Sequence, residues 1–303
     1  MNGCPPTEGS SFLATLGWWA QSRWDCLNAG RFPALKRLAK IGKSLRVTPA
    51  GLVILMLFTL TGTAETTNTL SAAEIQGRQF VQKILSQLPT ENYTNTGTLQ
   101  IRDENGHRIE VPVQFEVLAG KSGWKALYST EITNAINGDP TFGRAYFAQL
   151  TVLHSEDQPN VYKIPNVNPP PTETNNFLFL TGDQTMVPFA GSDFWYGDLG
   201  LEFFHWPQQK VLKKEFHRQC ACTVLESTNP NPSAQGYSRV VCWIDNDSLG
   251  IVEAFAYDVN GKKLKNFYPK NLEKVNGQYQ VESMVMENLQ TGSKSVLEFD
   301  LNK

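Results

Sequence analysis

The stretch Ile109-Glu-Val-Pro-Val-Gln-Phe-Glu-Val117 decides the fold class of this chain. Apolar side chains occupy every odd position of the stretch, and the even positions carry Glu, Pro, Gln and Glu. A period of two predicts a β-strand with one buried and one solvated face, as in an antiparallel sheet. Pro112 lies on the polar face and favours a strand edge or a bulge at that point.

Turn signals extend this pattern along the chain. Asn105-Gly106 predicts a hairpin that pairs 109–117 with a strand at 98–102, and Asn260-Gly261 marks another tight hairpin. Further strands are expected at a spacing of roughly 10–14 residues, over 123–131, 144–154, 161–164, 176–181, 210–226, 238–245, 251–258, 262–268, 279–287 and 295–301. Parallel βαβ alternation is not visible. We therefore expect a mainly β protein with α, built as a curved antiparallel sheet or unclosed β-barrel.

One amphipathic helix is expected ahead of the strands. Ser71-Ala-Ala-Glu74 forms a capping box, in which Ser71 accepts from a first-turn amide and Glu74 reaches back. Apolar residues then recur at helical spacing up to Pro89, namely Ile75, Phe80, Val81, Ile84, Leu85 and Leu88. A single apolar stripe requires a partner surface, so this helix is expected to cap the sheet.

The N-terminal region differs from the rest in charge. Residues 1–64 hold seven basic and two acidic residues, whereas 65–303 hold 20 basic and 27 acidic ones. Basic residues from Lys36 to Arg46 precede an uncharged run at 50–60, and small residues lead up to Ala64, as in a secretory signal peptide. The competing interpretation, a transmembrane anchor, needs about 20 apolar residues.

These features divide the chain into three parts. Residues 1–35 are expected to be a disordered leader or the product of a mis-assigned start. Residues 36–64 are the predicted signal peptide, cleaved near Ala64, and 65–303 are predicted to form a single domain exported to the periplasm.

Composition and motifs argue against several function classes. With 41% hydrophobic and 18% charged residues the chain can form a sizeable core, and the near balance of 27 basic and 29 acidic residues does not favour a nucleic-acid partner. The four histidines (107, 154, 205 and 217) stand in no catalytic motif. Asp193 and Asp198 could form a carboxylate pair, although a helix cap and a solvated side chain are the simpler interpretation. We expect no enzyme activity and no cofactor.

The cysteines of the body suggest a disulfide. Folding the loop at 227–236 about residue 232 places Cys222 opposite Cys242, so a cross-strand disulfide Cys222–Cys242 is predicted for an oxidising compartment. Cys220 points to the same strand face and could replace Cys222. A zinc site needs four ligands at suitable spacing, whereas Cys220, Cys222 and His217 are only three and lie too close together along the chain, so no metal is expected.

An aromatic segment at 191–206 interrupts the strands, and a short helix is expected over 199–204. A bent sheet leaves a concave apolar face, and a helix across its mouth would close a cavity suited to acyl chains. The alternative is that the aromatics fill an ordinary core. The candidates for a lipid-binding wall or lid are Phe194, Trp195, Leu199, Phe203, Phe204 and Trp206, with Phe80, Ile84 and Leu88 of the helix.

Four short motifs carry a resemblance to a known family. They are Gly-Ser-Asp-Phe-x-Tyr-x-Asp-Leu at 191–199, Cys-x-Val-Leu-Glu-Ser at 222–227, Tyr-Ser-x-Val-x-x-Trp-Ile-Asp at 237–245, and Ala-Tyr-Asp-x-x-Gly-Lys-x-Leu-Lys at 256–265. In this order, after a signal and a helix, they resemble the outer membrane lipoprotein-sorting protein family, which is similar to the periplasmic lipoprotein carriers (LolA-like). Gly197, where that family often has a polar or acidic residue, and the cysteine pair depart from its pattern.

The resemblance implies an unclosed β-barrel capped by helices and a non-enzymatic role. Its cavity would bind the acyl chains of a lipoprotein, or another apolar ligand, during transport across the periplasm. An inner-membrane donor and an outer-membrane acceptor would be partners of a monomeric carrier. The alternative is a periplasmic envelope-stress or assembly regulator of the same fold that acts by protein–protein contact. An integral outer-membrane barrel is disfavoured because regular aromatic girdles are not visible.

Overall fold

The computed structural model describes residues 70–121, 123–130, 148–155, 158–166, 176–275 and 278–301. The predicted leader and signal peptide lie outside these residues. Within them the chain forms helix α2 (Ala72–Leu85) and a single 13-stranded sheet. The strands are β1 (Tyr93–Arg102), β2 (Arg108–Leu118), β3 (Gly123–Thr130), β4 (Gln149–Ser155), β5 (Val161–Pro165), β6 (Phe177–Leu180), β7 (Gln208–His217), β8 (Cys220–Thr228), β9 (Arg239–Asp245), β10 (Ile251–Tyr257), β11 (Lys263–Val275), β12 (Gln278–Asn288) and β13 (Lys294–Phe299).

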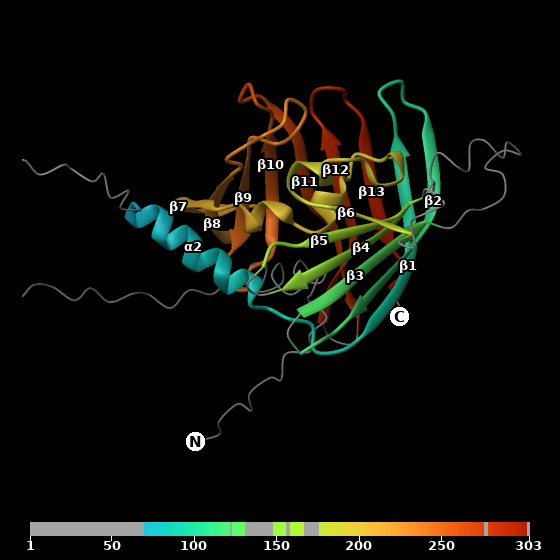
Figure 1. Ribbon diagram of the computed structural model, residues 1–303, viewed down its shortest axis with the longest axis horizontal. Helices are drawn as coiled ribbons and strands as arrows, with labels where there is room; N and C mark the ends of the chain where they lie inside the picture. The colour runs from blue at the N-terminus through green and yellow to red at the C-terminus, as the bar shows by residue number, and fades with distance from the viewer. Residues whose placement is uncertain are drawn as a thin grey trace, which may run out of the picture.

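The sheet consists of two meanders joined at their centre. Its order is β6-β5-β4-β3-β2-β1-β13-β12-β11-β10-β9-β8-β7, and every neighbouring pair is antiparallel. Strands β1 and β13 join the two halves, with Leu99 opposite Leu297. The sheet bends so that β3–β6 pass in front of the C-terminal strands, and it ends at β6 and β7 (Figure 1). The predicted unclosed antiparallel barrel is confirmed.

The deciding stretch behaves as its pattern predicts. In β2 the odd positions Val111, Val113, Phe115 and Val117 are buried, and the even positions are more exposed. The turn at 103–107 pairs β2 with β1. Among the described residues the pairing of β2 with β3 begins at Val113, directly after Pro112.

One segment crosses from the β6 edge of the sheet to the β7 edge. This crossing segment, residues 181–207, contains the 3₁₀ helices η2 (Gly182–Thr185), η3 (Phe189–Gly191) and η4 (Glu202–His205) and the single-turn helix α4 (Tyr196–Leu199). Its buried aromatic side chains belong to the same core as the inward residues of the sheet. The crossing segment therefore fills the concave side (Figure 1).

The short helix predicted over 199–204 is two separate turns. α4 ends at Leu199, and Leu201 adopts a left-handed conformation with φ 52° before η4 begins. A β-carbon at Gly200 would collide with the hydroxyl of Tyr162, so only glycine fits there. The helix suggested by the apolar spacing is therefore interrupted at Gly200 and Leu201, where Tyr162 approaches the backbone closely.

Helix α2 begins as predicted and packs on the last edge strand. Glu74 accepts from the backbone of Ser71 at 2.7 Å, which completes the capping box. At Gly77 the helix touches the backbone of β7, where a β-carbon would collide with the carbonyl of Gln209. Val81 and Ile84 are buried beneath the helix. Figure 1 shows α2 lying across the open side of the sheet near β7 and β8.

The single strand predicted over 210–226 is a hairpin. Arg218 and Gln219 form its turn with φ of 44° and 70°, and β7 and β8 pair on either side. Two consecutive left-handed residues suit the tight turn of a β-hairpin. Neither residue is the Gly, Asn or Asp that normally indicates such a turn, so the sequence pattern did not predict it.

The predicted disulfide Cys222–Cys242 is wrong. In the β8–β9 hairpin Cys222 lies opposite Asp245, and Cys242 lies opposite Leu225. The register thus differs by three residues from the predicted one, and an odd shift sends side chains to opposite faces. Cys242 lies in the main core, whereas Cys220 and Cys222 pack with Val252 on the other face. Within the described residues no disulfide joins them.

Candidate functional site

Two hollows lie beneath helix α2 on the concave side. The inner cleft has a volume of about 40 Å³. It is lined by Leu85, Gln87, Leu88, Trp124, His154, Ser155, Gly200, Leu201, Phe204 and His205. The outer groove is more open, with a volume of about 340 Å³. It is lined by Arg78, Val81, Gln82, Leu85, Phe204, Trp206, Pro207 and Gln209.

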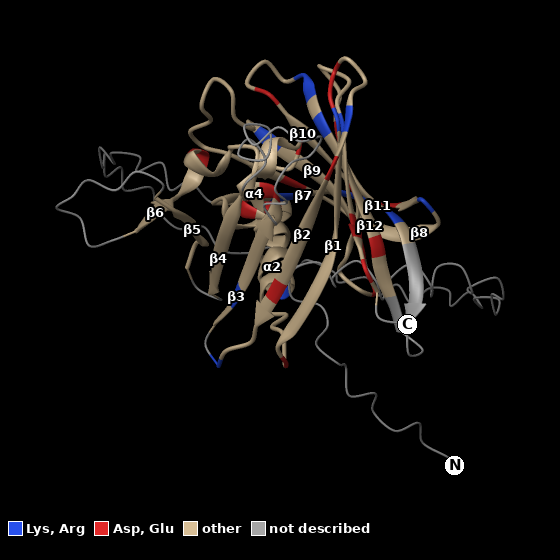
Figure 2. Cartoon of the chain, turned by 90° about the vertical axis from the view of Figure 1, so that its right-hand side faces the viewer, with Lys and Arg blue, Asp and Glu red and all other residues tan. Residues whose placement is uncertain are grey.

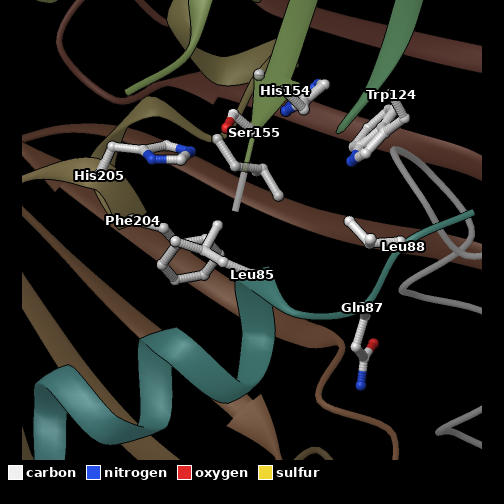
Figure 3. A pocket seen from close by; sticks show the side chains of 10 residues that line it. Leu85, Gln87, Leu88, Trp124, His154, Ser155, Phe204 and His205 are labelled. Carbon is white, nitrogen blue, oxygen red and sulfur yellow. The ribbon is translucent and has the colours of Figure 1, made fainter. Parts of the chain in front are cut away.

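Leu85 and Phe204 line both hollows, so the two hollows adjoin at these side chains. Leu85 is the last residue of α2, and Phe204 belongs to η4 of the crossing segment. Figure 3 shows these two side chains close together at the end of the helix, with Leu88 on the same side of the inner cleft.

The structure brings some of the predicted site residues to these hollows. Phe204 and Leu88 line the inner cleft, and Phe204 and Trp206 line the outer groove. Ile84 is fully buried under α2, and Phe80 is half-buried against the core. The end of helix α2 and the end of the aromatic segment thus meet at these hollows.

The other predicted residues lie apart from the hollows. Phe194 is 1% exposed and packs edge-on against Phe267 of β11. Leu199 and Phe203 are also buried in the core, and Trp195 stacks on Tyr237 with ring centroids 4.6 Å apart. These side chains fill the concave side. Their predicted lid role stays a prediction.

A buried lysine binds residues 193–198 of the crossing segment. Lys265 of β11 is 2% exposed and donates to the carbonyl of Asp193 at 2.6 Å. Its ammonium lies 3.5 Å from the Asp198 carboxylate and 3.5 Å from the centre of the Trp195 ring. Burial lowers the pKa of Lys265 to about 8, against the opposing effect of Asp198 and Asp193. The cation is therefore held by a carboxylate, a carbonyl and an aromatic face.

The two aspartates of the resembling motif are structural. Asp198 accepts from the backbone of Trp195 at 2.8 Å and from the hydroxyl of Tyr237 at 3.0 Å. Asp193 accepts from the hydroxyls of Ser293 and Ser295 at 2.6 and 2.9 Å. Asp198 is thus a helix cap, as the simpler interpretation had it, but it is buried. Figure 2 shows acidic positions at α4, enclosed by the sheet.

A second polar cluster lies behind the inner cleft. Asn160 donates to the carbonyl of Gly200 at 2.7 Å and to the hydroxyl of Tyr162 at 3.4 Å. Glu202 is buried, and burial raises its pKa to about 7 against an opposing hydrogen bond from Tyr162. The Asn160 Oδ1 and Glu202 Oε2 atoms are buried without a hydrogen-bond partner among the described residues. Buried polar atoms of this kind call for an explanation.

Two histidines line the cleft in front of this cluster. His154 stacks on Trp124 with ring centroids 3.6 Å apart and an interplanar angle of 10°. Burial, with a contribution from His205, lowers the pKa of His154 to about 3, and burial lowers that of His205 to about 4. Both imidazoles are therefore neutral near pH 7. The buried Nε2 of His154 has no hydrogen-bond partner in the described part of the chain.

Across the described ranges, three or more His, Cys, Asp or Glu side chains never gather as a metal ion would need. Nor does any helix in those ranges have the length and apolar character to cross a membrane.

Sequence reasoning missed several residues of this site. Leu85 stood in the predicted helix stripe but not among the candidates, and its spacing could have identified it. His154, His205 and Glu202 gave no signal, because they come from β4 and η4 and meet only through the fold. Lys265 occurs in a resembling motif, but a lysine in a strand pattern predicts a solvated side chain.

Comparisons with known proteins agree with this architecture. A sequence family described as uncharacterized protein matches residues 172–302. A DUF1329 family protein from Desulfovibrio piger superposes with a TM-score of 0.56 at 18% identity, covering 76% of this chain and 92% of its own. A structure described as an outer membrane lipoprotein-sorting protein domain from Vibrio parahaemolyticus gives 0.57 at 18% identity, covering 75% and 92%. The curated proteins yield no match.

The fold and these comparisons define the class of protein. A bent, unclosed antiparallel sheet with a helix across its open side is structurally similar to outer membrane lipoprotein-sorting protein domains. The fold expected from the sequence motifs is therefore confirmed.

Proposed function

We propose that this protein is a non-enzymatic periplasmic carrier that shields the acyl chains of lipoproteins. The observation that carries the proposal is the pair of hollows beside α2, both lined by Leu85 and Phe204. In this proposal a shift of the helix end joins them into one elongated channel. Each buried CH₂ group contributes about 0.8 kcal/mol, so an acyl chain requires cover to cross water. No bond needs to be made or broken in such a role.

The moving cover in this proposal is the end of helix α2 with residues 200–206. The inner cleft of about 40 Å³ is smaller than ordinary ligand sites, which have roughly 300–1,000 Å³. The outer groove of about 340 Å³ is within that range. Binding would therefore require α2 to shift from β7, and because β7 is an edge strand such a shift leaves the order of the sheet intact.

Native mass spectrometry with lipid extraction tests this proposal on protein recovered from the periplasm after expression of the full chain. Acyl species should co-purify with the wild type. Leu85→Trp should lose them because the indole would fill the junction of the two hollows. Ile75→Trp is the matched control, since Ile75 is exposed on the same helix, and it should keep the lipid. An empty wild type that also fails to take up a fluorescent acyl ester would refute the carrier.

One observation favours the alternative of a periplasmic regulator. Edge strand β6 exposes Phe177, Leu178 and Phe179 by 39%, 45% and 51%. Within the described residues this apolar edge pairs with β5 alone, and such an edge suits the addition of a strand from a partner protein. Should the protein prove empty of lipid, contact with a protein at β6 becomes the leading function.

A further inference from the structure

We propose that the inner cleft binds the uncharged ester or amide head of an acyl lipid and discriminates against the carboxylate of a free fatty acid; this inference rests on the proposed carrier function. The chain of the lipid would run past Leu85 into the outer groove. The proposal thus assigns a polarity to the channel, with the head inside and the chain toward the open groove.

The two sides of the cleft differ in chemistry. The rings of Trp124, His154 and His205 lie on one side, and Leu85 and Phe204 lie on the other (Figure 3). Indole and neutral imidazole N–H groups donate hydrogen bonds, and a carbonyl oxygen accepts them. An amphiphile with a carbonyl next to its chain matches this arrangement.

None of the described residues that line the cleft is Lys, Arg, Asp or Glu. A buried carboxylate without a cation is strongly disfavoured, whereas a neutral polar group needs only hydrogen bonds. The buried Nε2 of His154 has no hydrogen bond to a described atom, and in this proposal it donates to the ligand once the cleft widens around it.

The protein's own groups report how this environment treats charge. Burial raises the pKa of Glu202, the residue after Leu201 of the cleft lining, to about 7. The two cleft histidines have pKa values of about 3 and about 4 for the same reason. The interior here disfavours both an anion and a cation, so a neutral head is the chemistry that fits.

A cation lies at the other end of the route. Arg78 lines the outer groove with Trp206 and Gln209. A fatty acid could therefore lie reversed, with its carboxylate at Arg78 and its methyl end in the cleft. Titration with an ester and with a carboxylate of the same chain length distinguishes the two orientations.

The experiment titrates the full-length protein at pH 7.5 with 1-monomyristoylglycerol and with myristate, both below their micelle concentrations. The wild type should prefer the glycerol ester by about 10-fold or more. His154→Phe keeps the ring stack on Trp124 but removes the nitrogens, and it should weaken the ester about 5-fold while myristate is unchanged, as expected for one lost hydrogen bond. His107→Phe, at an exposed turn, is the matched control and should change neither affinity.

A gain-of-function variant keeps the test decisive if His154→Phe proves unstable. Ser155→Lys puts a cation at the cleft and should strengthen myristate binding at least 5-fold. Equal affinity of the wild type for both ligands, or tight myristate binding that Arg78→Gln abolishes, would overturn the head-in proposal while leaving a carrier in place. Failure to bind either ligand would instead refute the carrier itself.

Discussion

The two halves of the aromatic stretch 191–206, within the crossing segment, are held to the sheet in different ways. Residues 191–199 are tied by Asp193, Asp198 and Lys265 to strands β11 and β13. Residues 200–206 take part in no ion pair among the described residues. They pack through apolar side chains, and their backbone carbonyls accept from neutral side chains, Gly200 from Asn160 and both Phe203 and Trp206 from Gln209. A buried ion pair with its hydrogen bonds satisfied specifies one arrangement more strongly than neutral contacts do.

We call residues 191–199 with Lys265 the anchor, and residues 200–206 with helix α2 the cover. The aromatic motif at 191–199 is the conspicuous feature of the sequence, yet its side chains fix the segment in the core. The hollows lie against the second half and helix α2, where the sequence is plainer. The ion-pair network fixes 191–199, and in the proposed carrier a ligand would enter beside 200–206.

The largest effect should come from breaking the anchor. Asp198→Ala leaves the Lys265 ammonium buried without its carboxylate and removes the acceptor of Tyr237. Loss of one partner of a buried pair costs about 3–5 kcal/mol. Urea denaturation should show this loss for Asp198→Ala. The control Asp247→Ala, at an exposed position, should stay within about 0.5 kcal/mol of the wild type.

The sequence predicts some of these elements much better than others. The strand pattern, the Asn-Gly hairpins and the capping box depend on neighbouring residues, so β2, β12 and α2 followed from sequence periodicity. The hairpin turn at Arg218-Gln219 and the register of Cys222 depend on tertiary packing that no local signal encodes. Lys265 looks like a surface residue until Asp198 is brought beside it.

A smaller and pH-dependent effect should arise in the second half. Burial holds the pKa of Glu202 near 7, above the ordinary 4.5, so its protonated form favours the fold. That contribution is present below pH 4.5 and is lost as the pH rises through 7. Glu202→Gln keeps a neutral side chain at every pH, and it should therefore raise stability at pH 8 by up to about 3 kcal/mol.

Urea denaturation of both proteins at pH 4 and pH 8 measures this difference. At pH 4 the two curves should coincide. His154 and His205 also change charge on acidification, but they are present in both proteins and cancel in the comparison. A difference that is the same at both pH values would mean that the carboxyl of Glu202 ionises normally.

The smallest effect should be confined to the cover itself. Gly77→Ala places a methyl group against the carbonyl of Gln209, which pushes α2 away from β7. Overpacking costs about 1–3 kcal/mol, and the better helix propensity of alanine offsets up to about 1 kcal/mol, so a net loss of about 1 kcal/mol is expected. Amide hydrogen exchange should become faster in α2 and stay unchanged in β11 and β13, because the anchor is untouched. Gln76→Ala, exposed on the same helix, should leave all three elements protected, and faster exchange in β11 with Gly77→Ala would show that cover and anchor move as one unit.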